Sequence, residues 1–161
     1  MTIGVLSDTH IPKRAKELPQ IVLETFKDVD HIIHAGDIIC LDVLSQLEAL
    51  APVTAVAGNV DPPEIKDLLG EKKTLPLGGF RIGVIHGHGS RGSTASRALA
   101  GFQNEAADCI VFGHSHIPYC RYHGPVLMFN PGSPTDKRRN SHFSFGIIEL
   151  GATLKAKHIY F

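Results

Sequence analysis

The segment IGVLSDTH, residues 3–10, opens with a short apolar run that stops at the polar residue Ser7. The run is rich in Val, Ile and Leu and is too short for a helix, which is typical of a strand buried on both faces. Asp8 and His10 follow it with one residue between them. The sequence therefore predicts a buried first strand that carries a carboxylate and an imidazole at its carboxyl end.

Short apolar runs of the same kind recur along the chain, bounded by glycine or proline. They are rich in Val, Ile or Phe and are followed by polar residues, so we predict that they too form buried strands. These segments are HIIHAGD (31–37), VTAVAGN (53–59), RIGVIHGH (81–88), CIVFGHSH (109–116) and VLMFNPGS (126–133).

Helical periodicity separates several of these runs, because apolar residues recur there at spacings of three and four. Pro52 marks the end of the second helical pattern. The first half of the chain thus reads β-α-β-α-β, which predicts parallel strands joined by crossover helices. The three apolar stripes are Leu18, Ile21, Val22, Thr25, Phe26 and Val29; Leu44, Leu47, Leu50 and Ala51; and Ala95, Ala98, Leu99 and Phe102.

The last part of the chain has strand patterns without helices between them, namely PVLMFN (125–130), HFSFGIIEL (142–150) and LKAKHIYF (154–161). Together with the first half, they predict an α/β fold with a mixed sheet or two stacked sheets, flanked by helices. The length of 161 residues suits one domain that spans residues 1–161.

The composition excludes several classes of protein. The formal net charge is zero, whereas proteins that bind nucleic acid usually carry a basic excess, so we do not expect nucleic acid as an obligate partner. The three cysteines show no C-x-x-C spacing and predict neither a disulfide framework nor a zinc knuckle. We see no signal-peptide pattern and no apolar run near the ~20 residues of a membrane span, so we expect a cytoplasmic protein without a membrane partner.

Polar residues follow five of the predicted strands at the point where each strand ends. The carboxyl ends of parallel strands lie along one edge of a sheet, where open α/β sheets bind their ligands. We therefore expect these side chains to gather at one place. They are Asp8 and His10 after the first run, Asp37 after the second, Asn59 after the third, His86 after the fourth, and His114 and His116 after the fifth.

Each of these residues has an ordinary explanation when it is taken alone. An aspartate after a strand commonly caps a turn or a helix, and Gly-Asn is a common turn dipeptide. Taken together, the seven side chains would repel one another or lack partners unless they bind something. Divalent metal ions are the partner that this mixture of ligands predicts.

The ligand types narrow the choice of metal. The set has no thiolate, which argues against a structural zinc site of the cysteine type. Carboxylate, carboxamide and imidazole donors suit manganese, iron, zinc, cobalt or nickel. Seven ligands exceed the needs of one four-coordinate ion but suit two ions that share a carboxylate, an arrangement that catalyses phosphoryl displacement.

The ordered motifs resemble those of the calcineurin-like metallophosphoesterase superfamily. They are SDTH (7–10), AGD (35–37), AGNVD (57–61), IHGH (85–88) and GHSH (113–116). The similarity runs from about residue 3 to NPGS (130–133). The short chain, the HGH sequence and NPGS are most similar to the small bacterial and archaeal phosphodiesterase branch.

This resemblance implies the metallophosphoesterase fold, with two stacked mixed sheets flanked by helices, and a dinuclear metal centre. Asp37 would bridge the two ions, and a metal-bridging hydroxide would be the nucleophile. It implies manganese as the first candidate cofactor, with nickel, iron, zinc and cobalt as alternatives. The family pattern assigns Asp8, His10 and His116 to one metal and Asn59, His86 and His114 to the other.

One position departs from the pattern of many family members, which have histidine after the Gly-Asn pair. Val60 stands there, and valine cannot donate a proton to a leaving group. This favours phosphodiesters over phosphomonoesters as substrates. His88 is the best substitute donor, with orientation of the loop as the alternative, so we expect Asp37, Asn59 and His88 to act in catalysis.

Three other motifs have simpler interpretations at this stage. Asp61 could orient a metal ligand, but capping of the following turn is the expected role. Asn130 and Ser133 are expected to form a turn rather than to contact substrate. Arg91 and the DKRR segment (136–139) could meet a second phosphate, although a solvated loop is the expected role.

Two other functions compete with a metal-dependent phosphodiesterase of this kind. One is a phosphomonoesterase of the same superfamily. The other is a non-catalytic protein-binding scaffold that resembles the retromer subunit, in which ligand histidines tend to be replaced. The intact ligand set, including His10, favours an enzyme that acts on a small phosphodiester. The sequence leaves open whether the chain forms a homo-oligomer.

Overall fold

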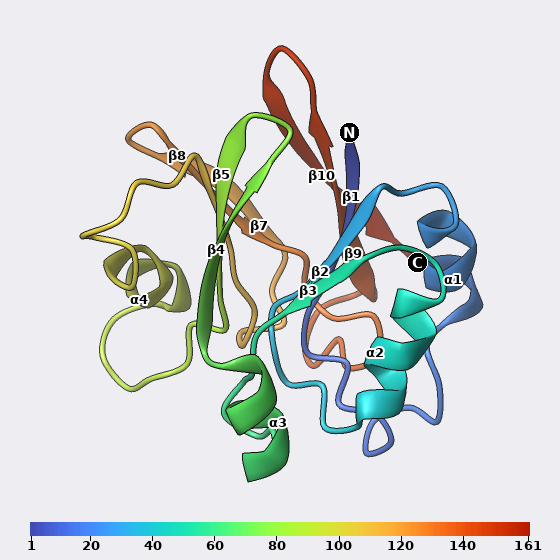
Figure 1. Cartoon of the computed structure of the whole chain (residues 1–161). Helices are drawn as coiled ribbons and strands as arrows, with labels where there is room; N and C mark the ends of the chain where they lie inside the picture. The colour runs from blue at the N-terminus through green and yellow to red at the C-terminus, as the bar shows by residue number, and fades with distance from the viewer.

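Two five-stranded β-sheets face each other in the computed structural model, which describes residues 1–161 (Figure 1). The first sheet has the strand order β10-β9-β1-β2-β3, and the second has the order β4-β5-β6-β8-β7. The predicted pair of stacked mixed sheets flanked by helices is therefore confirmed. The strands are β1 (Thr2–Leu6), β2 (His31–His34), β3 (Val53–Ala55), β4 (Lys72–Leu77), β5 (Phe80–Ile85), β6 (Cys109–Val111), β7 (Tyr119–His123), β8 (Val126–Asn130), β9 (Ser144–Leu150) and β10 (Leu154–Tyr160).

The first sheet begins with the predicted β-α-β-α-β unit. β1 pairs with β2 and β2 pairs with β3, both in parallel. The helices α1 (Gln20–Phe26) and α2 (Leu41–Glu48) connect these strands. β9 and β10 then extend the sheet on the other side of β1 as antiparallel strands, as expected for strands that follow each other without a helix.

The second sheet is also mixed. β5, β6 and β8 run parallel to one another, whereas β4 and β7 pair with β5 and β8 as antiparallel edge strands. The carboxyl ends of β5 and β6 face the carboxyl ends of the strands of the first sheet, because residues that follow both sets hydrogen-bond to one another. The N–H of Gly113 donates to His86 O within the second sheet, and His86 Nδ1 contacts Ala35 O of the first.

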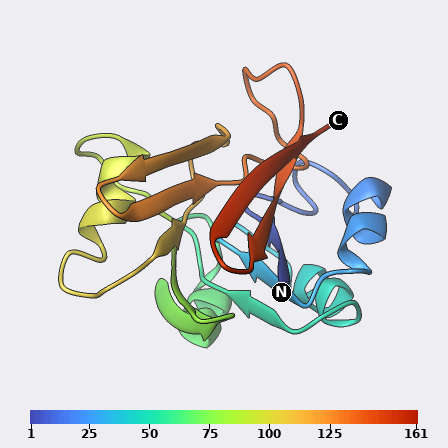
Figure 2. The ribbon, with the colours of Figure 1, turned by 90° about the horizontal axis from the view of Figure 1, so that it is seen from above.

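The core has one apolar layer between the sheets and one on each outer face. Between the sheets, Val5 and Ile33 pack in the same cluster as Val84 and Val111. The helices α1 and α2 cover the outer face of the first sheet, and α4 (Thr94–Ala100) covers that of the second (Figures 1 and 2).

The helix α1 lies very close to β1. A Cβ atom at Gly4 would come within 2.7 Å of the Phe26 ring, so the absence of a side chain in the middle of this strand lets the helix approach. The predicted stripe from Leu18 to Val29 is longer than the helix, which begins after Pro19.

Three elements were not predicted from the sequence: α3 (Pro63–Leu69), β4 and β7. Both strands lie at the edges of the second sheet, and their residues are mostly exposed or half-buried. Their sequences therefore lack the continuous apolar run that marks a buried strand. None of the four helices has both the length and the hydropathy that a membrane-spanning helix needs.

Candidate metal centre

The seven predicted ligands gather where the two sheets meet. Asp8, His10, Asp37 and Asn59 follow β1, β2 and β3 of the first sheet, whereas the remaining three follow β5 and β6 of the second. The expectation of one common sheet edge is therefore wrong in detail, because two facing sheets supply the site. The residues from the second sheet are His86, His114 and His116.

The first group of side chains consists of Asp8, His10 and His116. Their ligand atoms lie within 4.8 Å of one another. His116 Nε2 is 3.4 Å from Asp8 Oδ1 and 3.3 Å from His10 Nε2. The structure thus brings together the three residues that the family pattern assigns to one ion.

The second group is centred on Asp37 and His86, with Asp8 close by. Asp37 Oδ2 lies 3.2 Å from His86 Nε2 and 3.6 Å from His10 Nε2. One carboxylate oxygen therefore contacts a histidine of each group, as a bridging ligand requires.

Asn59 joins the second group from the side of β3. Its Oδ1 atom is 3.2 Å from His86 Nε2 and 3.1 Å from His114 Nδ1. Lys66 Nζ donates a hydrogen bond to the Asn59 carbonyl oxygen at 3.1 Å. His114 also meets the other residues directly, because its backbone N–H donates to Asp8 Oδ2 at 2.9 Å and its ring centroid is 5.2 Å from that of His86.

The backbone at this site is strained. Seven non-glycine residues of the protein have positive φ angles. This backbone conformation is uncommon for residues other than glycine. Strain of this kind persists only when the surroundings fix the conformation, and it concentrates at functional sites. Five of the seven are predicted ligands, namely Asp8, His10, Asp37, His114 and His116.

Hydrogen bonds on the outer side of two imidazole rings orient them toward the site. His86 Nδ1 is 2.7 Å from Ala35 O, and His116 Nδ1 is 2.5 Å from Asp136 O. A carbonyl oxygen only accepts hydrogen bonds, so Nδ1 carries the proton in both rings. When these rings are neutral, the lone pair of Nε2 is left to face the site, as in metal-binding histidines.

The carboxylates and His86 shift one another's pKa values. Burial raises the pKa of Asp8, but the contact with His10 and the charge of His86 outweigh burial and lower it to about 2. Burial lowers the pKa of His86, yet Asp37 and Asp8 outweigh burial and raise it to about 9. The site thus stabilises the ionised form of the Asp8 carboxylate, and the carboxylates stabilise a positive charge placed beside them.

These residues fit a centre for divalent cations. Carboxylate oxygens and imidazole nitrogens converge within contact distance, and they are buried or half-buried. Groups of acceptors that face one another in a buried site are unfavourable without a positive partner. The donor set is of the kind that first-row divalent metals prefer.

The family comparison agrees with this geometry. The family model for the calcineurin-like phosphoesterase superfamily domain matches residues 1–153. The chain belongs to this superfamily. Membership of this superfamily indicates a phosphoric ester hydrolase, and it implies divalent metal ions at the site.

The chain is similar to individual proteins from archaea and to solved structures. A probable metallophosphoesterase of Methanothermobacter thermautotrophicus is 42% identical over 139 residues, which cover 86% of this chain and 80% of that protein. An archaeal phosphodiesterase has a similar fold, with a TM-score of 0.78 and 24% identity over the full length of both chains. Vps29 of Entamoeba histolytica, solved with zinc, has a TM-score of 0.76 and 23% identity over 99% of each chain.

Asp61 organises the loop that carries Asp37. The buried Asp61 carboxylate accepts hydrogen bonds from the backbone N–H groups of Asp37, Ile38, Ile39 and Gly58, at 2.7–2.9 Å. It makes no capping bond to α3. The expected role as a cap of the following turn is therefore wrong, and the alternative of orienting a ligand is the one that the contacts support.

The NPGS segment also holds loops at the candidate site in place. Asn130 Nδ2 donates to Gly113 O at 2.8 Å, and Ser133 Oγ donates to Asp8 O at 2.8 Å. Thr135, which follows the segment, donates to Thr9 O at 2.6 Å. These side chains connect the end of β8 to the loops after β1 and β6.

Two other histidines lie next to the predicted ligands. The His88 ring is 5.7 Å from His86 and 6.4 Å from His114, centroid to centroid, and its buried Nδ1 has no hydrogen-bond partner. His34, which sequence reasoning missed, is fully buried beneath the site and contacts Thr9 Oγ1 at 3.1 Å. Burial lowers the pKa of His34 to about 3, so it stays neutral.

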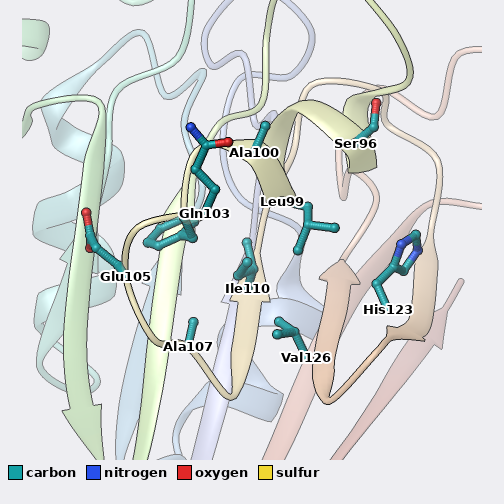
Figure 3. Close-up of a pocket in the computed structure, with 10 residues that line it drawn as sticks. Ser96, Leu99, Ala100, Gln103, Glu105, Ala107, Ile110, His123 and Val126 are labelled. Atoms are coloured by element: carbon teal, nitrogen blue, oxygen red, sulfur yellow. The ribbon is translucent and has the colours of Figure 1, made fainter.

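Two cavities of the protein differ in their relation to the site. A cavity of about 520 Å³ lies between α4 and the strands β6 and β8, where Leu99, Ile110 and Val126 form apolar walls (Figure 3), and none of the seven predicted ligands lines it. A cleft of about 260 Å³, here called the His10 cleft, opens beside the first group of ligands. Its walls are His10, Lys13, Arg14, Ile39, Val60, Asp136 and Arg138.

Proposed function

We propose that this protein is a phosphodiesterase that hydrolyses small phosphodiesters at a centre of two divalent cations. The observation that carries the proposal is the position of Asp37, whose Oδ2 atom contacts His86 and His10 at 3.2 and 3.6 Å. A carboxylate between two groups of metal-type ligands supports a pair of ions rather than a single ion.

Each ligand has a proposed place in this centre. Asp8, His10 and His116 would hold one cation, and Asn59, His86 and His114 the other, with Asp37 shared between them. When bound, the two cations supply an activated water molecule as nucleophile and stabilise negative charge on the phosphoryl oxygens. Manganese is the first candidate, and nickel, iron, zinc and cobalt are alternatives, because these donors suit several of the first-row metals.

The choice of a diester over a monoester depends on Val60. The residue is 41% exposed and lines the His10 cleft beside the candidate metal centre, which supports a position next to the proposed substrate. Valine has no proton to give to a leaving oxygen, and a poorly activated monoester needs such a donor more than a diester does. The similarity of fold to an archaeal phosphodiesterase supports the same choice.

His88 is the residue that we propose as proton donor to the leaving group. Its ring is beside His86 and His114, and one of its nitrogens has no partner within the protein. A His88→Ala variant with normal metal content should lose activity toward diesters with poor leaving groups more than toward nitrophenyl diesters, which need no donor. Equal losses on both classes of diester would instead indicate a role in orienting the loop.

Two other functions are weaker candidates. A phosphomonoesterase needs a donor that Val60 does not supply. A protein-binding scaffold does not need a complete set of ligands, whereas this chain has all seven, five of them in a strained backbone conformation.

Hydrolysis of chromogenic esters tests the proposal. The purified protein is freed of metal, loaded with manganese, nickel, cobalt or zinc, and assayed on bis(4-nitrophenyl) phosphate and on 4-nitrophenyl phosphate. We expect metal-dependent hydrolysis with a higher kcat/KM for the diester. Absence of turnover with every metal would refute the enzyme, and a preference for the monoester would refute the diester.

A further inference from the structure

The His10 cleft concentrates positive charge next to the metal centre. Lys13, Arg14 and Arg138 line it, and Asp136 is its only acidic residue. The cleft therefore carries an excess of two positive charges, three minus one, in a chain whose formal net charge is zero. A local excess of this kind attracts anions and raises their concentration at the site.

The positive residues are connected to the metal ligands through the backbone and through Asp136. The N–H of Arg14 donates to His10 O at 2.9 Å, and Arg14 Nε is 3.2 Å from Asp136 Oδ2. The carbonyl oxygen of Asp136 accepts the hydrogen bond from His116 Nδ1. The cleft is therefore fixed in place by two ligands of the same proposed cation, His10 and His116.

Two of the three cations have no acidic partner. Arg14 forms an ion pair with Asp136, but Lys13 and Arg138 take part in no ion pair of the protein. Arg138 also has a left-handed backbone, with a φ of 48°, which is the strain expected where a side chain is held for binding. Its N–H donates to Asp136 Oδ1 at 3.3 Å.

The size of the cleft points to a small anion. Its volume of about 260 Å³ is below the roughly 300–1,000 Å³ that is typical of sites for drug-sized ligands. Guanidinium and ammonium groups are the side chains that bind phosphate oxygens most strongly, the guanidinium often through two parallel hydrogen bonds. Ile39 and Val60 add apolar contacts at the same cleft.

We propose that Lys13 and Arg138 bind a second phosphate group of the substrate in the His10 cleft. The preferred substrates would then be small phosphodiesters that also carry a phosphomonoester. This inference rests on the proposed phosphodiesterase function, because it gives the same site a narrower class of substrate.

A matched pair of substrates tests the proposal. The first is the 5′-(4-nitrophenyl phosphate) of thymidine, and the second is the same diester with a phosphate on the 3′-hydroxyl. The leaving group is identical, so only the second phosphate differs. We expect kcat/KM to be about five- to tenfold higher for the phosphorylated diester, mainly through a lower KM, as expected for exposed charge-assisted contacts.

The variant Lys13→Ala/Arg138→Ala removes the two unpaired cations. We expect the ratio of kcat/KM between the two substrates to fall to about one. The control variant Lys16→Ala/Arg139→Ala removes the same charge from exposed neighbours that do not line the cleft, and its ratio should stay at the wild-type value. A matching pair of diesters without the thymine base separates recognition of phosphate from recognition of a nucleoside.

A binding measurement gives a readout that does not depend on activity. Inorganic phosphate is titrated into the metal-free, ¹⁵N-labelled protein, and the backbone amide signals are followed by NMR. We expect shifts at Lys13, Arg14 and Arg138 that saturate in the wild type and the control variant, and that are lost in Lys13→Ala/Arg138→Ala.

The outcomes separate this proposal from the proposed function. Equal kcat/KM for the two diesters in the wild type, or a preference that survives in Lys13→Ala/Arg138→Ala, would overturn the cleft proposal and leave the phosphodiesterase intact. If neither diester is hydrolysed with any metal, the proposed phosphodiesterase function is refuted. The phosphate titration then tests by itself whether Lys13 and Arg138 bind phosphate in the His10 cleft. Absence of saturable shifts at the cleft residues would overturn the cleft proposal.

Discussion

In the proposed centre, Asp37 lies between the two groups of ligands, beside Asp8, which belongs to both groups. The backbone of Asp37 is left-handed, its Oδ2 atom faces His10 and His86, and its Oδ1 atom accepts the N–H of Val60 at 3.0 Å. Gly58 has no side chain where a Cβ would overlap Asp37 Oδ1. The Gly-Asn pair of the sequence is therefore required by the packing of the neighbouring carboxylate as well as by the turn.

Replacement of Asp37 tests this role. Asp37→Ala should lower the metal content from two ions per chain to fewer than one, because both cations lose a shared ligand, and should reduce diester hydrolysis more than about a hundredfold. Elemental analysis and the diester assay measure both effects. Asp42→Ala, an exposed acid on α2, is the matched control, and two ions per chain in Asp37→Ala would refute the bridge.

Val60 is another residue to which we assign a proposed role, namely the preference for a diester over a monoester. Val60→His should raise the ratio of monoesterase to diesterase activity by about tenfold, because general acid catalysis contributes roughly 10²–10⁴ in rate and a new histidine recovers part of it. Val60→Ala controls for the loss of the valine side chain. An unchanged ratio in Val60→His would mean that the missing donor does not limit monoester hydrolysis.

At the scale of elements, side-chain hydrogen bonds hold the loops that follow the strands of the first sheet. The loop after β2 donates three N–H groups to Asp61, and the loop after β3 donates one. The loop after β1 is held by Ser133 and Thr135. The N–H of His10 also donates to Asp37 O at 3.0 Å. Loops fixed in this way keep their candidate ligands in position without a cation. This lowers the entropic cost of binding a cation, because the ligands are already ordered.

Removal of the Asp61 carboxylate should release the loop after β2. Asp61→Ala leaves several buried N–H groups without partners, so we expect a loss of about 3 kcal/mol in the free energy of unfolding. Asp61→Asn keeps one oxygen and should lose about half as much. Urea unfolding measures both, with Asp67→Ala on the exposed side of α3 as control. A stability of Asp61→Ala within about 0.5 kcal/mol of the control would contradict this account.

At the scale of the whole molecule, the facing sheets bury charged and polar groups that make stability depend on pH. In the metal-free protein the pKa of His86 is raised to about 9, and that of His34 is lowered to about 3. The native state therefore binds a proton at His86 more tightly than the unfolded chain does, and binds one at His34 less tightly. His86 therefore makes stability fall as the pH rises above the ordinary histidine pKa, whereas His34 makes stability fall as the pH drops below it.

We expect the stability of the metal-free protein to be greatest near pH 6.5. As the pH rises from about 6.5 to about 9, the contribution of protonated His86 is lost. As the pH falls from about 6.5 to about 3, protonation of His34 in the unfolded chain favours unfolding. Asp8 adds stability that is lost only as the pH falls below its ordinary value toward about 2.

Thermal unfolding across this range measures the profile. We expect the loss toward pH 9 to be on the order of 2 kcal/mol without metal, and to shrink when a saturating cation takes the place of the proton. His34→Gln should flatten the acid side alone. A metal-free protein that is as stable at pH 9 as at pH 6.5 would contradict the role of His86.

The sequence alone determined the buried strands, three of the four helices and the set of candidate ligands, because these depend on local patterns of apolar and polar residues. It did not predict the exposed edge strands β4 and β7, which have no buried face to produce such a pattern. Only the tertiary structure decided that two facing sheets supply the ligands. It decided that Asp61 holds the loop that carries Asp37. It also decided that Lys13 and Arg138 line one cleft. Those contacts join residues far apart in the chain, and long-range packing rather than local periodicity sets them.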